Sequence, residues 1–178
     1  MKTSSPSGGK AKALPQAEKR LVSIGLAIAE EMEAKAVSFY TGASRKKGVR
    51  ADLKSIFVFL IKEEKNHLKV VKALEKVLKK QGYFKKLKIK GSGTPAKKIF
   101  RKGRDFSRAI NSGELSLGLW ALNTERLSKK FYESMEKKTR NRTAKRFFAQ
   151  LASFEQRHFK LIDDALEQIA GTEGLFST

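Results

Sequence analysis

Four long stretches of this sequence repeat apolar residues at steps of three and four, and none of them contains a proline. Pro6, Pro15 and Pro95 all lie outside these stretches. Apolar residues at such steps form one stripe along a helix, whereas a proline inside a helix would break it. The pattern therefore predicts an all-α fold whose helices span about residues 17–44, 51–81, 113–138 and 142–170.

The predicted connections between these helices differ greatly in length. Short turns join the first helix to the second and the third to the fourth, whereas residues 82–112 form a long basic crossover in the middle. Two antiparallel hairpins joined in this way make a four-helix bundle with one crossover connection. We expect the bundle to span residues 16–172, with residues 1–15 as a flexible basic tail and residues 173–178 as a short C-terminal tail.

The only two histidines of the chain each follow a glutamate by three residues, in the pairs Glu64–His67 and Glu155–His158. Residues three apart lie on one face of a helix, so the carboxylate and imidazole of each pair can reach the same metal ion. A Glu-x-x-His on each of two helices is half of a di-metal carboxylate site, and one glutamate from each remaining helix completes it. The chain has no cysteine, so its metal ligands must be oxygen and nitrogen, which suits iron, manganese or zinc.

The other two glutamates follow from an approximate internal repeat. Tyr40 follows Glu33 by seven residues and Tyr132 follows Glu125 by seven, so each half of the chain reads Glu-x6-Tyr and then Glu-x2-His. Counted from the predicted turns at about 1.5 Å per residue, these glutamates and those of the Glu-x2-His pairs stand at similar heights in the bundle. Charged residues inside apolar stripes need compensation, which metal ions would supply. We therefore expect two metal ions bound by Glu33, Glu64, His67, Glu125, Glu155 and His158.

On these motifs, residues 17–170 resemble the ferritin-like superfamily, in particular rubrerythrins and bacterioferritins. The resemblance implies a ferritin-like bundle that binds two iron ions, with each histidine on one ion. It also implies that Glu64, together with Glu125 or Glu155, bridges the two ions. Manganese, or a mixed pair of iron and manganese, would suit the same ligands.

The same resemblance implies that Tyr40 and Tyr132 are hydrogen-bonded to ligating carboxylates, which would tune the metals. The chain also departs from both families. Lys65 stands where bacterioferritins have a haem-binding methionine, so we expect no haem. Without cysteine, the chain cannot form the rubredoxin-type iron domain of rubrerythrins, and it lacks the extra glutamate of their third helix.

The expected function is that of a di-iron oxidoreductase of ferroxidase or peroxidase type, which oxidises Fe(II) with O2 or hydrogen peroxide in iron handling or oxidative stress. An external electron donor would return the metals to Fe(II), because the chain contains no second redox centre. One alternative is a di-metal oxidase that acts on an organic substrate. Another is a structural bundle in which the two Glu–His pairs are only hydrogen-bonded. We expect a homodimer or a larger homo-oligomer.

Positive charge is the other marked property of the sequence. The net charge is +21, from 39 lysines and arginines against 18 acidic residues, and the segment from Lys79 to Arg104 has eleven basic residues and no acidic one. Such a segment attracts polyanions, although a basic surface can also serve solubility alone. The alternative function is therefore a nucleic-acid-associated protector that contacts phosphates through Lys85, Lys86, Lys88, Lys90, Lys97, Lys98, Arg101, Lys102 and Arg104.

The sequence predicts a cytoplasmic protein. Residues 1–20 are polar and lack the apolar stretch of a signal peptide. The most apolar short run, from Ile56 to Ile61, is too short to span a bilayer, so we expect no transmembrane segment.

Overall fold

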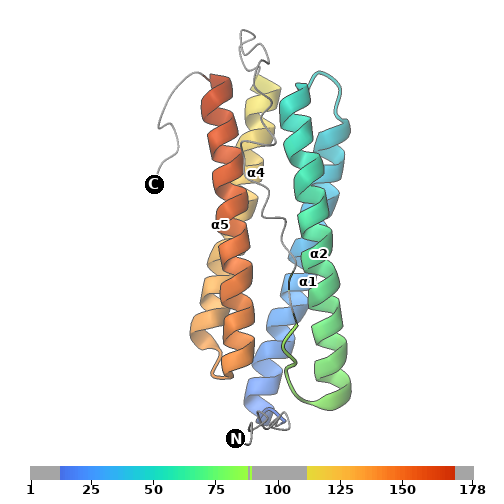
Figure 1. The fold of residues 1–178 in the computed structure, drawn as a ribbon, viewed down its shortest axis with the longest axis vertical. Coiled ribbons are helices and arrows are strands. Elements are labelled where there is room, and N and C mark those ends of the chain that lie inside the picture. Colours follow the sequence, from blue (N-terminus) through green and yellow to red (C-terminus); the bar gives the residue numbers. More distant parts are fainter. Residues whose placement is uncertain (1–12, 88, 90–111, 171–178) are drawn as a thin grey trace, which may run out of the picture.

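The computed structural model describes residues 13–87, 89 and 112–170, and the regular structure within them is entirely helical. The helices are α1 (Gln16–Arg45), α2 (Ala51–Gln81), α4 (Ser112–Lys138) and α5 (Arg142–Ala170). Each begins and ends within one residue of its predicted bounds. Figure 1 shows the four helices running side by side along the length of the molecule. The predicted all-α four-helix bundle is confirmed.

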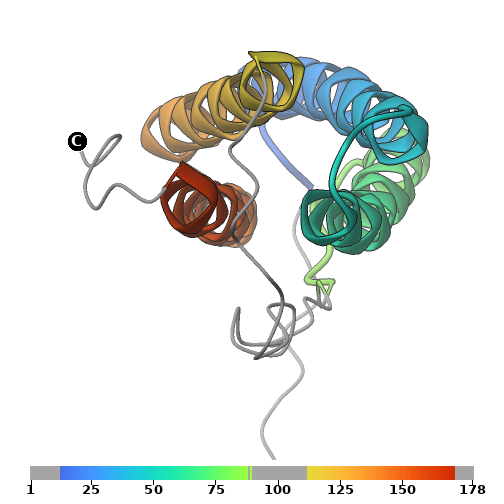
Figure 2. The same ribbon diagram turned by 90° about the horizontal axis from the view of Figure 1, so that it is seen from above.

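The helices pair as two antiparallel hairpins, α1 with α2 and α4 with α5. Figure 2 shows the hairpins standing next to each other, with α1 beside α4 and α2 beside α5. Helix α2 ends at one end of the bundle, and α4 begins at the opposite end (Figure 1). The two helices therefore run in the same direction and are parallel. Most of the predicted crossover, most of the predicted N-terminal tail and all of the C-terminal tail lie outside the described residues.

Two glycines with left-handed backbone conformations mark the limits of α2. One lies in the turn that precedes the helix, and the other ends the helix. Gly48 lies in the turn between α1 and α2 with φ of 81°, and Gly82 ends α2 with φ of 70°. The N–H of Gly82 donates to the carbonyl of Leu78 at 3.0 Å. Residues other than glycine rarely adopt this conformation, so these two glycines set where the chain reverses or leaves the helix.

The turn of the second hairpin is capped and tied to the first. The side-chain oxygen of Asn141 accepts hydrogen bonds from the N–H groups of Thr143 and Ala144 at 3.1 and 2.9 Å, which caps the start of α5. Glu18 near the start of α1 accepts the N–H groups of Arg140 and Asn141 at 2.8 and 2.9 Å. These bonds fix the end of one hairpin against the end of the other.

Two apolar clusters form the core, one toward each end of the bundle. The first contains Leu26 and Phe148 among its fully buried members, and the second contains Leu60 and Ile162. On every helix, the fully buried positions between the two clusters hold polar residues, so the bundle has a polar layer at mid-height. No helix among the described residues is both long and apolar enough to cross a membrane.

Candidate metal centre

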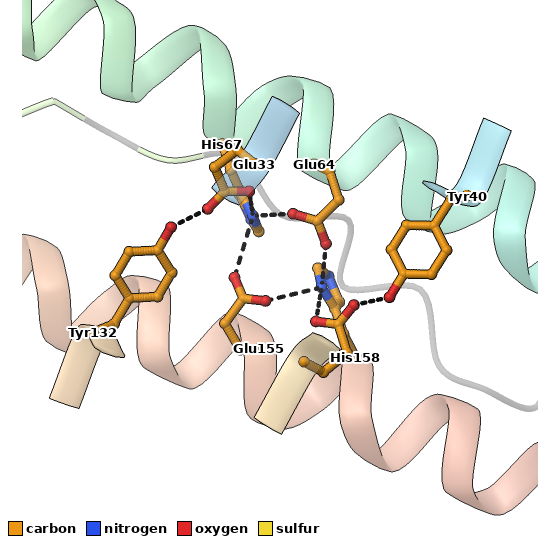
Figure 3. Close-up of polar contacts among 8 residues, drawn as sticks. Glu33, Tyr40, Glu64, His67, Tyr132, Glu155 and His158 are labelled. Carbon is orange, nitrogen blue, oxygen red and sulfur yellow. Dashed lines mark hydrogen bonds and ion pairs between the residues drawn. The ribbon is translucent and has the colours of Figure 1, made fainter. Parts of the chain in front are cut away.

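Six of the buried side chains in the polar layer are those predicted as metal ligands, and Glu63 and Ser128 are buried there as well. Each of the six predicted ligands exposes at most 3% of its surface, although four of them are carboxylates. Figure 3 shows the labelled glutamates and histidines turned toward one another between the helices. They come from all four helices, in the order Glu33 on α1, Glu64 and His67 on α2, Glu125 on α4, and Glu155 and His158 on α5.

The six residues form two overlapping groups of four, each of which can hold a metal ion. The first quartet is Glu33, Glu64, His67 and Glu155, and the second is Glu64, Glu125, Glu155 and His158. Within each quartet the potential ligand atoms lie within 4.8 Å of one another. Glu64 and Glu155 belong to both quartets, so these two carboxylates are shared between the two candidate metal positions.

Both histidines turn the Nδ1 nitrogen toward the carboxylates. His67 Nδ1 lies 3.0 Å from Glu64 Oε2 and 3.5 Å from Glu33 Oε2. His158 Nδ1 lies 2.8 Å from Glu64 Oε1 and 3.5 Å from Glu125 Oε2. Glu64 therefore presents one oxygen to each histidine. The two imidazole rings are stacked, with centroids 5.5 Å apart and planes 18° from parallel.

Two tyrosines reach into the layer, each from one hairpin to the other. The hydroxyl of Tyr40 on α1 donates to Glu125 on α4, and that of Tyr132 on α4 donates to Glu33 on α1. Both side chains are fully buried. Burial and the neighbouring carboxylates raise the pKa of both hydroxyls well above its ordinary value, so they remain protonated donors. Each tyrosine thereby orients a carboxylate of the opposite hairpin.

The centre has an approximate two-fold symmetry that reflects the sequence repeat. Matching residues of α1 and α4 are 92 positions apart, as in Tyr40 and Tyr132, and those of α2 and α5 are 91 apart, as in His67 and His158. Each tyrosine also stacks on a phenylalanine of its own hairpin, with planes 23° apart in both cases. The two halves of the chain therefore contribute equivalent parts to one site.

Burial strongly shifts the acid–base chemistry of the cluster. Burial and the charge of Glu64 raise the pKa of Glu33 to about 8, and burial also raises the pKa of Glu155 well above its ordinary value. Burial opposes ionisation of Glu64 too, but His158 and His67 beside it hold its pKa well below the usual range. Against the effect of burial, hydrogen bonds to carboxylates raise the pKa of His67 to about 9, and the charge of Glu64 raises the pKa of His158 well above its ordinary value. Metal ions that bind here must displace protons that the cluster holds in their absence.

Several buried atoms of the ligand residues have no hydrogen-bond partner among the described residues. These atoms are Glu64 Oε1, His67 Nε2, Glu125 Oε2, Glu155 Oε1, and both ring nitrogens of His158. Buried polar atoms normally have partners, and an unpaired one is costly. Glu64 Oε1 and His158 Nδ1 are close enough for an ion pair, but their geometry does not suit a hydrogen bond. Four of these atoms, Glu64 Oε1, Glu125 Oε2, Glu155 Oε1 and His158 Nδ1, belong to the facing carboxylate and histidine groups, and such unpaired atoms fit a site built for metal ions.

Other buried carboxylates lie outside this cluster, and sequence reasoning did not single them out. Glu114 in the first turn of α4 accepts the backbone N–H of Arg50 at 2.7 Å, just before α2 begins. Asp52 accepts a bond from the Arg50 guanidinium at 2.8 Å. Their partners are backbone and arginine groups, so they tie helix ends together. The only sequence signal was an acidic residue in the first turn of a helix, where it also suits the helix dipole.

Of the residues predicted to bind anions, the described part of the chain contains Lys85 and Lys86, and both are exposed. The remaining seven lie outside the described residues. They are Lys88, Lys90, Lys97, Lys98, Arg101, Lys102 and Arg104. Their predicted contacts with phosphates stay a prediction.

Replacing Tyr40 with phenylalanine should lower the free energy of unfolding of the metal-free protein by about 1–3 kcal/mol, because a buried oxygen of Glu125 loses its donor. Tyr132→Phe should have a similar effect through Glu33. Urea denaturation in the presence of a chelator measures both. The control is Tyr83→Phe, because Tyr83 is partly buried and lies outside the layer. Changes no larger than the control's would contradict this account of the hydroxyls.

No family model matches the chain, and it matches neither a curated protein nor a solved structure. Any statement about its function therefore rests on the residues and the geometry of the site.

Proposed function

We propose that the chain is a ferritin-like di-iron oxidoreductase that oxidises Fe(II) with O2 or hydrogen peroxide. The observation that carries this proposal is the pair of buried quartets that share Glu64 and Glu155. Four carboxylates and two imidazoles from four helices are the ligand set of di-iron carboxylate proteins. The absence of sulfur ligands fits iron and equally manganese, so a manganese or mixed pair is the nearest alternative metal content.

Charge supports two divalent ions in this layer. Four ionised carboxylates packed between apolar clusters would repel one another, and their burial is costly unless positive charge compensates it. Two divalent cations would cancel four negative charges while both histidines bind as neutral ligands. The metal-free cluster reaches a similar balance only by keeping protons on groups such as Glu33 and His67.

When bound, two adjacent iron ions supply one electron each and two positions for the oxygen atoms of a single oxidant. The residues of the chain prepare this chemistry. Glu64 and Glu155 hold the two metal positions close together, and each histidine completes one quartet. Tyr40 and Tyr132 keep Glu125 and Glu33 oriented. The apolar clusters on both sides keep bulk water out of the layer.

A purely structural role for the two Glu–His pairs fits the geometry less well. A buried polar network that serves stability is normally fully hydrogen-bonded, because each unpaired member is destabilising. Here an atom that faces the other ligand residues lacks a hydrogen-bond partner among the described residues in Glu64, Glu125, Glu155 and His158. Unpaired atoms are what a ligand set leaves when its metal ions are removed.

The proposal can be tested by titrating chelator-treated protein with Fe(II) without oxygen, and then mixing it with O2 or hydrogen peroxide. We expect two Fe(II) per chain and an iron oxidation that is faster than in buffer alone. Glu125→Gln should lose one of the two ions, because Glu125 belongs only to the second quartet. Glu136→Gln, on the same helix but outside the layer, should bind and oxidise two. The proposal is wrong if the native protein binds no Fe(II), or if Glu125→Gln keeps both ions and the full rate.

A further inference from the structure

The solvent face of α2 carries a regular row of lysines. Their spacing alternates between three and four residues, so they lie on one side of the helix. At about 1.5 Å of rise per residue, the row is about 25 Å long. All of its members are exposed. We call this set the lysine row, and it comprises Lys62, Lys65, Lys69, Lys72, Lys76 and Lys79.

No exposed acidic residue interrupts this face of α2. Three of the four acidic residues of the helix are buried, and the fourth, Glu75, is partly buried. Lys72 lies 3.5 Å from Glu30 and Lys79 lies 2.9 Å from Glu75, and both lysines remain more than half exposed. The other four members have no ion pair with any described residue. Exposed ion pairs contribute little to stability, so all six lysines are available to an anionic partner.

The internal repeat provides a comparison within the same chain. Residues of α5 that are 91 positions later occupy the equivalent face in the second half. In place of the first five lysines of the row, α5 has Ser153, Gln156, Lys160, Asp163 and Glu167. The same helix position in the same fold thus has five positive charges in one half and a net charge of −1 in the other. Neither the fold nor the metal layer requires a basic face here, so the lysine row calls for a separate explanation.

We propose that the lysine row binds the phosphate backbone of duplex nucleic acid, without reading its sequence. A row of exposed cations along one helix face complements the closely spaced charges of a duplex. The row contains no aromatic residue on which the bases of a single strand could stack. A membrane surface fits less well, because binding at a bilayer normally buries apolar side chains beside the basic ones. Five of the six exposed large apolar residues that we find lie on α1 and α4 instead, namely Ile24, Ile28, Leu119, Trp120 and Leu127.

This inference is independent of the proposed iron chemistry. On α2 the lysines point away from the bundle, whereas Glu64 and His67 point into it. Substitutions in the row should therefore leave the metal layer intact. The row also differs from the basic crossover singled out from the sequence, since five of its six members precede Lys79.

The test is binding of a fluorescent duplex of random sequence, measured by anisotropy between 50 and 200 mM salt. The variant carries Lys65→Gln, Lys69→Gln and Lys76→Gln. If these lysines contact phosphates, the slope of log K against log salt should become less negative by about 2.7, and affinity at 100 mM salt should fall roughly tenfold or more. The matched control removes three exposed lysines from α4, as Lys130→Gln, Lys137→Gln and Lys138→Gln, and should change the slope much less.

Thermal unfolding followed by circular dichroism checks that both triple variants keep the fold. Three outcomes would overturn the proposal. The native protein could fail to bind the duplex at 50 mM salt, the two triple variants could lose affinity equally, or the chain could bind phosphatidylserine vesicles but not the duplex. Equal losses would mean that only net charge matters, and vesicle binding alone would identify a membrane surface as the partner.

Discussion

Glu64→Gln should abolish tight metal binding at both positions of the buried layer. Glu64 belongs to both quartets and presents one oxygen to each histidine. Changing a residue that only orients a metal ligand typically costs ten- to a hundredfold in affinity, so losing a shared ligand should cost more than about a hundredfold at each position. Isothermal titration of chelator-treated protein with Fe(II) under nitrogen measures both the affinity and the number of ions.

The contrast with single-quartet ligands makes this result specific. Glu125→Gln should spare one ion, whereas Glu64→Gln should spare neither. Glu31→Gln, at an exposed position on α1, should bind like the native protein. Glutamine has nearly the shape of glutamate, so Glu64→Gln should keep the helical circular dichroism spectrum. Two ions bound at native affinity in this variant would mean that Glu64 is not a shared ligand.

Removing the metals should cost the protein several kcal/mol of stability. A ligand present at a thousand times its dissociation constant stabilises the folded state by about 4 kcal/mol per site. Two such sites should raise Tm by more than about 10 °C in a chain of this size. The physical source is relief of repulsion and of unpaired buried atoms in the layer. Differential scanning calorimetry with metal, and then with a chelator, measures the difference.

The double variant Glu64→Gln/Glu155→Gln removes both shared carboxylates and serves as the comparison. Its Tm should no longer depend on metal, so its transitions recorded with metal and with a chelator should coincide. If the native protein melts at the same temperature with and without metal, the layer is not a metal site.

The helices could be predicted closely because their boundaries carry strong local signals. Gly82 ends α2 in a left-handed conformation, and Asn141 caps α5. The six ligand candidates could be predicted because both histidines lie at a helical spacing from a glutamate. That glutamates of different helices meet at one height followed from the turn positions and the rise of a helix. The binding of iron and the reaction stay predictions, because no sequence or structural match bears on them.

The partners of the tyrosines could not be predicted from the spacing. Seven residues along a helix amount to a rise of about 10 Å, which is too far for Tyr40 to reach Glu33. Only the antiparallel packing of α1 against α4 brings Tyr40 to Glu125 and Tyr132 to Glu33. A motif within one helix thus indicated the right residues, while the hydrogen bonds depend on how the hairpins pack.

The lysine row was equally hard to recognise in the sequence. Lysines on an exposed helix face are common, and the denser charge after Lys79 drew attention to the crossover instead. The row stands out only when the fold pairs α2 with α5 and shows that the equivalent face of α5 is not basic. The internal repeat therefore allows the face of α2 to be compared with the equivalent face of α5 within one chain.

The tyrosine hydrogen bonds that cross between the two hairpins limit how small a functional unit of this protein can be. Each hairpin holds a glutamate that only the other hairpin's tyrosine steadies, and each quartet draws ligands from both. A single hairpin therefore has no complete centre, yet two copies of one hairpin, placed about the same two-fold axis, would contain every part. The arrangement of its parts is therefore that of an approximately symmetric dimer of hairpins joined in one polypeptide.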